Sequence, residues 1–284
     1  RCRKPSTVMP DGRQINIELK RGGLTMAIFQ RPFGQKNGNI MQASTGAEVT
    51  NDNPAIEDVG TGGIQWITER HVACVFLLDT SGSMVANDAI GKLNAGLRTF
   101  KEQTISDSSF DEHTKACIDV ALVSFGPDVQ VQQGFTAVSE MIPPTLTANG
   151  GTPMGAAIDK ALDMIAEQKA KYNQYGTPYY RPWIFCITDG GPNDSYATAA
   201  QRLKEMEDAT KVLGYCVGVA NFDRHTMASI FNPERIFELD NLNFPALFKF
   251  VSSSLATVRN SDPNGGRSVA VEAPGDLHTI NVAF

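Results

Sequence analysis

The sequence predicts an α/β protein with a doubly wound, mostly parallel central sheet, helices on both of its faces and one antiparallel edge strand. From His71 onward, short apolar runs alternate with segments of helical length. Several runs are apolar at every position, which is typical of strands buried on both faces. Two of these runs end on an aspartate, Asp79 and Asp189. Alternating strands and helices of these lengths favour a parallel sheet that is covered on both sides.

The chain before residue 71 does not share this alternation. Residues 1–25 carry six basic and two acidic side chains, and Met26 would be an ordinary start. We therefore expect 1–25 to be a basic extension or a non-native leader. Residues 26–70 are rich in Gly, Asn, Gln and Thr, and the Gly-Thr-Gly-Gly run at 60–63 breaks regular structure. They predict an irregular lead-in to a domain that spans 71–258.

Within that domain, apolar runs predict the strands and three- to four-residue apolar spacing predicts the helices. Pro153 fits the first position of a helix. The last part of the chain, 259–284, is turn-rich at first, and we expect it to be a tail or a short strand extension. The expected strands are 72–78, 117–125, 183–188, 215–219 and 235–239, with an edge hairpin strand at 128–138. The expected helices are 89–103, 153–169, 196–213, 226–231 and 245–258.

Composition narrows the class of protein. The chain has 284 residues, 42% hydrophobic and 20% charged, as in ordinary globular proteins. A net charge of −6 argues against non-specific nucleic-acid binding, which needs a basic face. No apolar run reaches the length of a membrane helix. Four of the five cysteines lie singly in apolar runs, which predicts buried free thiols and favours a reducing, cytoplasmic location.

Oxygen-bearing side chains gather where the predicted strands end. Asp79, Ser81 and Ser83 follow one apolar run, Thr152 lies in a Gly-Gly-Thr-Pro loop before a helix, and Asp189 follows another run. Loops after neighbouring central strands of such a sheet meet at one crevice. Oxygen-only ligands suit hard cations such as Mg²⁺, and this set carries too little charge for a closed cage. Asp194 is expected to cap a helix rather than to add a sixth ligand.

These three motifs resemble the metal-ion-dependent adhesion site (MIDAS) of a von Willebrand factor type A domain over about residues 70–258. The resemblance implies that Ser81, Ser83 and Thr152 bind the metal directly, whereas Asp79 and Asp189 act mostly through water or by hydrogen-bonding the hydroxyls. Within the family, the chain is similar to the bacterial tellurium-resistance-associated group (TerY and YegL type). Further stretches that carry this similarity are Leu-Val-Ser-Phe at 122–125 and Leu-Phe-Lys-Phe-Val-Ser-Ser-Ser at 247–254.

Such a site predicts binding rather than catalysis. Mg²⁺, with Mn²⁺ or Ca²⁺ as alternatives, keeps exchangeable waters, and an Asp or Glu of another protein can replace one of them. We therefore expect a non-enzymatic, metal-dependent protein-interaction module in a bacterial stress or tellurite-resistance system, with kinases or phosphatases among its partners.

Three other interpretations remain open at this stage. Each aspartate or serine alone could simply cap a loop or satisfy a turn. A metal-dependent hydrolase or phosphatase using Ser81 is another alternative, although the sequence has neither a Gly-x-Ser-x-Gly elbow nor a phosphate-binding Gly-x-x-x-x-Gly-Lys loop. The third is an extracellular adhesin or a nucleic-acid-binding member of the same family. The lone cysteines weigh against the adhesin, and the basic residues in 1–25 keep nucleic-acid binding open.

Overall fold

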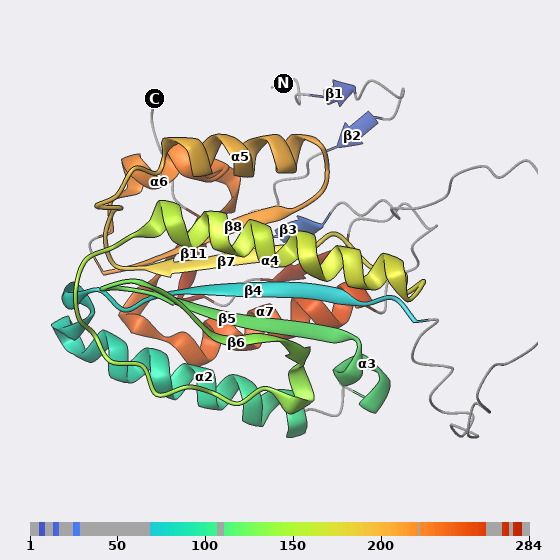
Figure 1. Cartoon of the computed structure of the whole chain (residues 1–284), viewed down its shortest axis with the longest axis horizontal. Helices are drawn as coiled ribbons and strands as arrows, with labels where there is room; N and C mark the ends of the chain where they lie inside the picture. Colours follow the sequence, from blue (N-terminus) through green and yellow to red (C-terminus); the bar gives the residue numbers. More distant parts are fainter. Residues whose placement is uncertain are drawn as a thin grey trace, which may run out of the picture.

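A seven-stranded sheet forms the centre of the protein, with the strand order β11-β9-β8-β7-β4-β5-β6 (Figure 1). The computed structural model describes residues 69–106, 111–220, 222–259 and 275–279, together with short strands at 6–8, 14–16, 25–28 and 269–272. Most of the predicted extension (1–25) and lead-in (26–70) lies outside the described residues. The strands of the sheet are β4 (Val72–Asp79), β5 (Ile118–Phe125), β6 (Val129–Ala137), β7 (Trp183–Thr188), β8 (Leu213–Val219), β9 (Ile236–Leu239) and β11 (Leu277–Thr279).

The middle strands are parallel and the two edges are antiparallel. β4 pairs in parallel with β5 on one side and with β7 on the other. All eight residues of β4 are buried, as expected for a strand that has helices over both faces. β6 returns antiparallel beside β5, and β11 lies antiparallel beside β9. The structure thus confirms the predicted fold class and adds β11 as a second antiparallel edge strand.

Helices cover both faces of the sheet (Figure 1). α4 (Met154–Gln174), α5 (Ala197–Asp208) and α6 (Arg224–Ile230) lie on one face. α2 (Ala89–Ser106) and α7 (Phe244–Arg259) lie on the other. The shorter helices are α3 (Glu112–Ala116), η1 (Gly82–Asp88), η2 (Val138–Glu140), η3 (Pro233–Arg235) and η4 (Asp240–Leu242). No helix among the described residues is long and apolar enough to cross a membrane.

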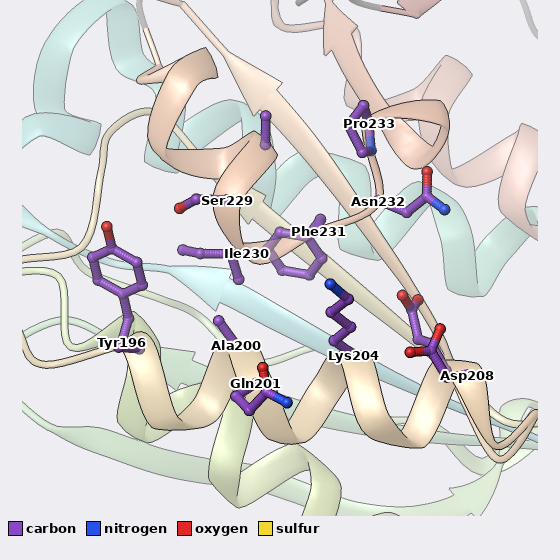
Figure 2. A pocket seen from close by; sticks show the side chains of 13 residues that line it. Tyr196, Ala200, Gln201, Lys204, Asp208, Ser229, Ile230, Phe231, Asn232 and Pro233 are labelled. Atoms are coloured by element: carbon purple, nitrogen blue, oxygen red, sulfur yellow. The ribbon is translucent and has the colours of Figure 1, made fainter. Parts of the chain in front are cut away.

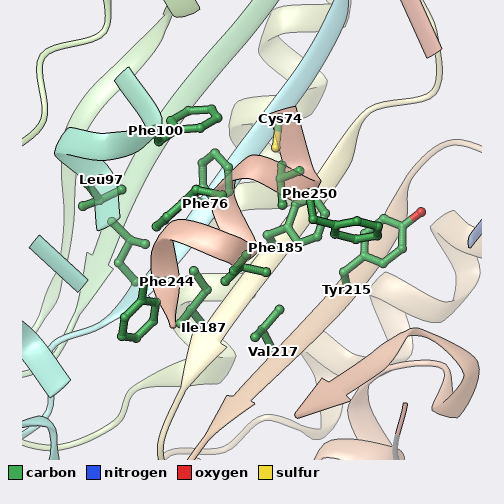
Figure 3. Close-up of a cluster of buried hydrophobic side chains, with 14 of the residues drawn as sticks. Cys74, Phe76, Leu97, Phe100, Phe185, Ile187, Tyr215, Val217, Phe244 and Phe250 are labelled. Atoms are coloured by element: carbon green, nitrogen blue, oxygen red, sulfur yellow. The ribbon is translucent and has the colours of Figure 1, made fainter. Parts of the chain in front are cut away.

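The core under α2 and α7 is aromatic (Figure 3). The ring of Phe76 on β4 lies 5.6 Å from Phe100 of α2, 5.8 Å from Phe185 of β7 and 5.4 Å from Phe248 of α7, measured between ring centroids. The Phe76 side chain of the central strand therefore joins four elements, and its edge-to-face and stacked ring contacts add to the stabilisation from buried apolar area. The opposite core, under α4 and α5, is mainly aliphatic. Together the two cores hold the ends of β4 and β7 in a fixed relation.

Several boundaries differ from the predicted ones. The helix expected over 196–213 ends at Asp208, because Thr210 has a left-handed φ of 56° and the chain then enters β8 at Leu213. α3 was not predicted; the Asp111 side chain caps it by accepting a 2.7 Å hydrogen bond from the backbone N–H of Thr114. The strand expected from residue 117 begins at Ile118.

Short strands also occur in the flanking segments. β1 (Ser6–Val8) pairs antiparallel with β2 (Gln14–Asn16). β3 (Thr25–Ile28) pairs antiparallel with β10 (Val269–Glu272). The second pair joins segments that lie on either side of the predicted domain in the sequence. Of the two strands in the C-terminal segment, β10 therefore pairs with β3 near the start of the chain, whereas β11 extends the main sheet.

Candidate metal centre

The fold brings the predicted site residues to one edge of the sheet. Asp79 is the last residue of β4, and Asp189 directly follows β7. Because these neighbouring strands are parallel, their carboxyl ends lie at the same edge. Ser81 immediately precedes η1 and Ser83 lies within it, so both hydroxyls stay close to the tip of β4.

Three of the predicted residues form one hydrogen-bonded chain. The Ser83 hydroxyl donates to Asp189 Oδ1 over 2.8 Å, and the hydroxyls of Ser81 and Ser83 lie 3.0 Å apart. Asp79 helps to position these hydrogen-bonded side chains, because its Oδ1 accepts a 2.8 Å hydrogen bond from the backbone N–H of Ser81. Its Oδ2 accepts a 2.6 Å hydrogen bond from the hydroxyl of Thr188 on β7. The two strand tips are thus tied together through the Asp79 carboxylate.

The Thr152 loop lies against this group through its backbone. Gly150 O accepts a 3.0 Å hydrogen bond from the N–H of Gly82, and Thr152 O accepts a 3.1 Å hydrogen bond from the N–H of Asn193. Thr152 is only 8% exposed. These two backbone bonds place the loop between the segments that carry Ser81 and Asp189.

The two glycines of the loop approach their neighbours closely. Gly150 has a left-handed φ of 75°, and a Cβ there would lie 2.5 Å from the Cα of Pro127, so the loop needs glycine at this position. A Cβ on Gly151 would lie 2.1 Å from the side-chain nitrogen of Asn193, so a larger residue there would have to displace that side chain.

Asp79 is the electrostatic centre of the group. Its side chain is fully buried, and burial raises the pKa of its carboxyl from 3.8 to about 6, although the hydrogen bonds from Ser81 and Thr188 oppose this and the charge of Asp189 adds to it. Within the described part of the chain, no lysine or arginine pairs with Asp79. A buried carboxylate without a counter-charge is costly, and a cation at the rim would offset that cost.

The donor set fits a hard cation. No group of three or more His, Cys, Asp or Glu side chains that could hold a metal ion occurs among the described residues, so a metal at this edge would depend on hydroxyl oxygens. Three hydroxyls and two carboxylates meet that need, and such oxygen ligands suit Mg²⁺, which usually keeps several of its waters. The residues present therefore fit the predicted metal.

Two residues around the group have roles that the sequence only partly indicated. Thr188 directly precedes Asp189, and its position at the end of an apolar strand was the available signal for its bond to Asp79. Asp194 is a cap, as predicted, but it caps α4 from a distant loop: its two oxygens accept hydrogen bonds of 3.0 and 2.9 Å from the N–H groups of Gly155 and Ala156. It thereby fixes the start of the helix that follows Thr152.

Other features of the molecule lie apart from this group. A groove of about 560 Å³ runs between α5 and the α6–η3 segment, where Tyr196, Lys204 and Phe231 line it (Figure 2). None of the five predicted site residues lines this groove. His71 Nδ1 lies 2.7 Å from Asp119 Oδ2, just before the start of β4. The four cysteines in strand-like runs are buried and free, as predicted.

Comparison with known proteins identifies the fold. A family model described as von Willebrand factor type A domain matches residues 74–250. The pilus adhesin SpaC from Lactobacillus rhamnosus GG matches with a TM-score of 0.52 and 14% identity, over 66% of this chain and 31% of that chain. BatB from Bacteroides thetaiotaomicron matches with a TM-score of 0.47 and 20% identity, over 67% of this chain and 100% of that chain.

A third structure is a proximal thread matrix protein from the mussel byssus, with a zinc-occupied MIDAS motif. Its TM-score is 0.46 and its identity 17%, over 68% of this chain and 47% of that chain. No curated protein matches the sequence. At these identities the structural likeness concerns the fold alone, and the chain spans about a third of the length of the adhesin.

Proposed function

Because the chain belongs to the von Willebrand factor type A domain family, we propose that its β4–β7 rim is a MIDAS that binds a divalent cation and, through it, a carboxylate of a partner protein. One observation carries the proposal. Ser81, Ser83 and Asp189 form a continuous hydrogen-bonded chain beside the buried, uncompensated Asp79. A set of loop caps that served structure alone would not need a buried carboxylate without a counter-charge.

The hydroxyls of Ser81, Ser83 and Thr152 would hold the cation directly. Asp79 and Asp189 would orient these hydroxyls and bind the metal's waters. When bound, Mg²⁺ supplies an exchangeable coordination position and a positive charge that two carboxylates neutralise only in part. Mn²⁺ and Ca²⁺ are the alternative ions. An Asp or Glu from the partner would complete the shell and act as the anchor of the interface.

The surroundings of Ser81 favour binding over catalysis. A nucleophilic serine needs a base within hydrogen-bond reach. The side-chain contacts of Ser81 are with Ser83 and Asp79, and no histidine or lysine contacts it among the described residues. Val85, two residues after Ser83, is 64% exposed and offers an apolar contact next to the metal position. We therefore propose a non-enzymatic interaction module.

The setting that we propose follows from the motifs outside the metal site. The stretches at 122–125 and 247–254 resemble the bacterial tellurium-resistance-associated group, so we propose a cytoplasmic bacterial stress or tellurite-resistance system. Protein kinases or phosphatases are the partner class that this resemblance suggests.

Calorimetric titration with MgCl₂ tests the metal, and a pull-down with and without EDTA tests the partner. We expect Asp79→Ala and Ser83→Ala to weaken Mg²⁺ binding about 10–100-fold, because each removes a metal-orienting or metal-binding oxygen. Ser106→Ala changes an exposed hydroxyl at the far end of α2 and serves as the control. Partner capture that persists in EDTA, or in both site variants, would refute the metal-dependent mechanism.

A further inference from the structure

A second group of charges lies at the opposite edge of the sheet. Lys169 belongs to the second half of α4, while Arg181, Lys211 and Arg235 each lie one or two residues before a strand, β7, β8 and β9 respectively. Because these strands are parallel, the three positions share the amino edge of the sheet. We call these four residues the cationic cluster. The length of β7, at about 3.3 Å per residue, separates the cluster from the metal site by roughly 20 Å.

The cluster surrounds the turn that connects α5 to β8. Lys169 Nζ donates a 2.5 Å hydrogen bond to the carbonyl oxygen of Lys211, and Arg181 donates one of 2.7 Å to the carbonyl oxygen of Glu207. Arg235 forms a 2.7 Å ion pair with the carboxylate of Glu207. Three cations thus contact a segment that contains a fourth, Lys211, and Glu207 forms an ion pair with one of them.

Most of the positive charge in the cluster is not neutralised. Within the described residues, neither Lys169 nor Lys211 has a carboxylate at ion-pair distance, and the buried Nε of Arg181 has no acceptor. Burial, together with the charges of Lys211 and Arg181, lowers the pKa of Lys169 to about 8. Burial and the charge of Arg235 likewise lower the pKa of Arg181 to about 10.

A purely structural role explains only part of this arrangement. Arg181 bonds a carbonyl in the last turn of α5, where a cation is favourable. Lys169 likewise bonds the carbonyl oxygen of Lys211 in the turn that follows, and Arg235 pairs with Glu207. Lys169 and Lys211 nevertheless add two further charges of the same sign, and their repulsion adds to burial in lowering the pKa of Lys169. Groups held together against their own repulsion are typical of sites that bind an opposite charge.

We propose that the cationic cluster binds a phosphate-type oxyanion, with Lys169, Arg181 and Lys211 as its donors. A tetrahedral dianion accepts several charge-assisted hydrogen bonds at once, and it would neutralise the two lysines that lack a carboxylate. The donors come from α4 and from the segments that precede β7 and β8, so the sheet and its helices position their backbones. This site is independent of the metal centre at the other edge.

Calorimetric titration of the full chain with inorganic phosphate tests the proposal. EDTA is present throughout, so that a metal-bound phosphate at the other edge cannot contribute. We expect saturable binding, weakened about tenfold or more by Lys169→Gln and by Lys211→Gln, because each removes a charge-assisted contact. Lys211 is exposed, so its variant keeps the fold if the Lys169 variant does not. Lys160→Gln, on an exposed part of α4, should change the affinity less than about twofold.

Further titrations define the ligand. O-phosphoserine distinguishes a phosphorylated side chain from the free ion, and binding of either probe with the same dependence on Lys211 supports the site. Sodium chloride at matched ionic strength should give no saturable heat. The proposal is overturned if phosphate does not bind the wild type, or if Lys211→Gln and Lys160→Gln bind it equally well.

Discussion

At the scale of a single residue, Asp79 has two opposing effects on stability: its hydrogen bonds stabilise the fold, and its buried charge destabilises it. Its two oxygens join the tips of β4 and β7 by accepting hydrogen bonds from Ser81 and Thr188. Its charge, however, is buried without a basic partner among the described residues. A site that is ready for a cation is therefore a site of electrostatic stress in the metal-free protein.

This stress predicts the effect of Asp79→Asn and its pH dependence. Burial raises the folded-state pKa of Asp79 from 3.8 to about 6, so the folded chain binds more protons than the unfolded chain between these values. In EDTA, stability should then fall as pH rises through that window, by at most about 3 kcal/mol. Asp79→Asn removes the charge and should be as stable as the wild type or more stable at pH 7, with the two converging near pH 4.

Urea unfolding of both proteins in EDTA at several pH values measures this effect. Asp128→Asn, which alters an exposed carboxylate on the β5–β6 hairpin, is the matched control and should follow the wild type. A clear loss of stability in Asp79→Asn at pH 7 would show that the hydrogen bonds of the carboxylate outweigh its desolvation, contrary to this account.

At the scale of elements, the packing of α2 against α7 depends on one small residue. Gly96 of α2 is buried, and a Cβ there would lie 2.5 Å from the Cβ of Phe244 and 3.1 Å from the ring of Phe248. Both phenylalanines are fully buried and cannot move aside without disturbing the aromatic core around Phe76. The two helices would have to separate to admit even a methyl group.

Gly96→Ala should therefore lower the free energy of unfolding by about 1–3 kcal/mol, as overpacking of a core does. The higher helix propensity of alanine, worth about 1 kcal/mol, reduces this loss but does not cancel it. Thermal or urea unfolding measures the difference. Gly134→Ala on β6, where a Cβ meets nothing within 4 Å, should change stability by less than about 0.5 kcal/mol. Equal effects of the two changes would argue against tight α2–α7 contact.

The same scale shows why the sequence predicted some elements and missed others. β4 and β7 are apolar at nearly every position, so their pattern indicates burial on both faces without tertiary information. The end of α5 was placed five residues too late, because the stop depends on the left-handed φ of Thr210, to which residue type gives little clue. α3 is one turn long and is held by the Asp111 cap and its contacts, too little for a periodic signal.

The residues of the candidate site were easier to predict than the residues that hold the surrounding loops in place. Asp79, Ser81, Ser83, Thr152 and Asp189 stand at strand ends or in a glycine loop, and topology alone brings such positions to one edge. The contact of Asn193 with the Thr152 loop joins residues that are 41 positions apart, and the Asp194 cap of α4 is equally remote. Neither follows from local pattern. The same holds for the cationic cluster, whose members are unremarkable basic residues until the sheet aligns them.

At the scale of the whole molecule, metal binding and stability are coupled, because an ion that binds only the folded chain stabilises it. At a Mg²⁺ concentration about 100 times its dissociation constant, the gain is about 2.7 kcal/mol. Bound Mg²⁺ would also offset the cost of the buried Asp79 charge. We therefore expect the order of stability of the wild type and Asp79→Asn to reverse when Mg²⁺ is added. In EDTA, Asp79→Asn should unfold at a urea concentration equal to or above that of the wild type, whereas in saturating Mg²⁺ the wild type should be the more stable protein.

Lys169→Gln tests whether this response belongs to the β4–β7 rim. Its position at the far edge of the sheet, roughly 20 Å away by strand length, leaves the metal ligands untouched, so its gain in stability from Mg²⁺ should equal that of the wild type. Parallel urea titrations of the wild type, Asp79→Asn and Lys169→Gln, in EDTA and in Mg²⁺, measure the free energy of unfolding of each protein in each condition. A Mg²⁺ response that survives in Asp79→Asn but is lost in Lys169→Gln would place the cation elsewhere. If the order of wild type and Asp79→Asn stays the same in both conditions, the buried carboxylate is not linked to metal binding.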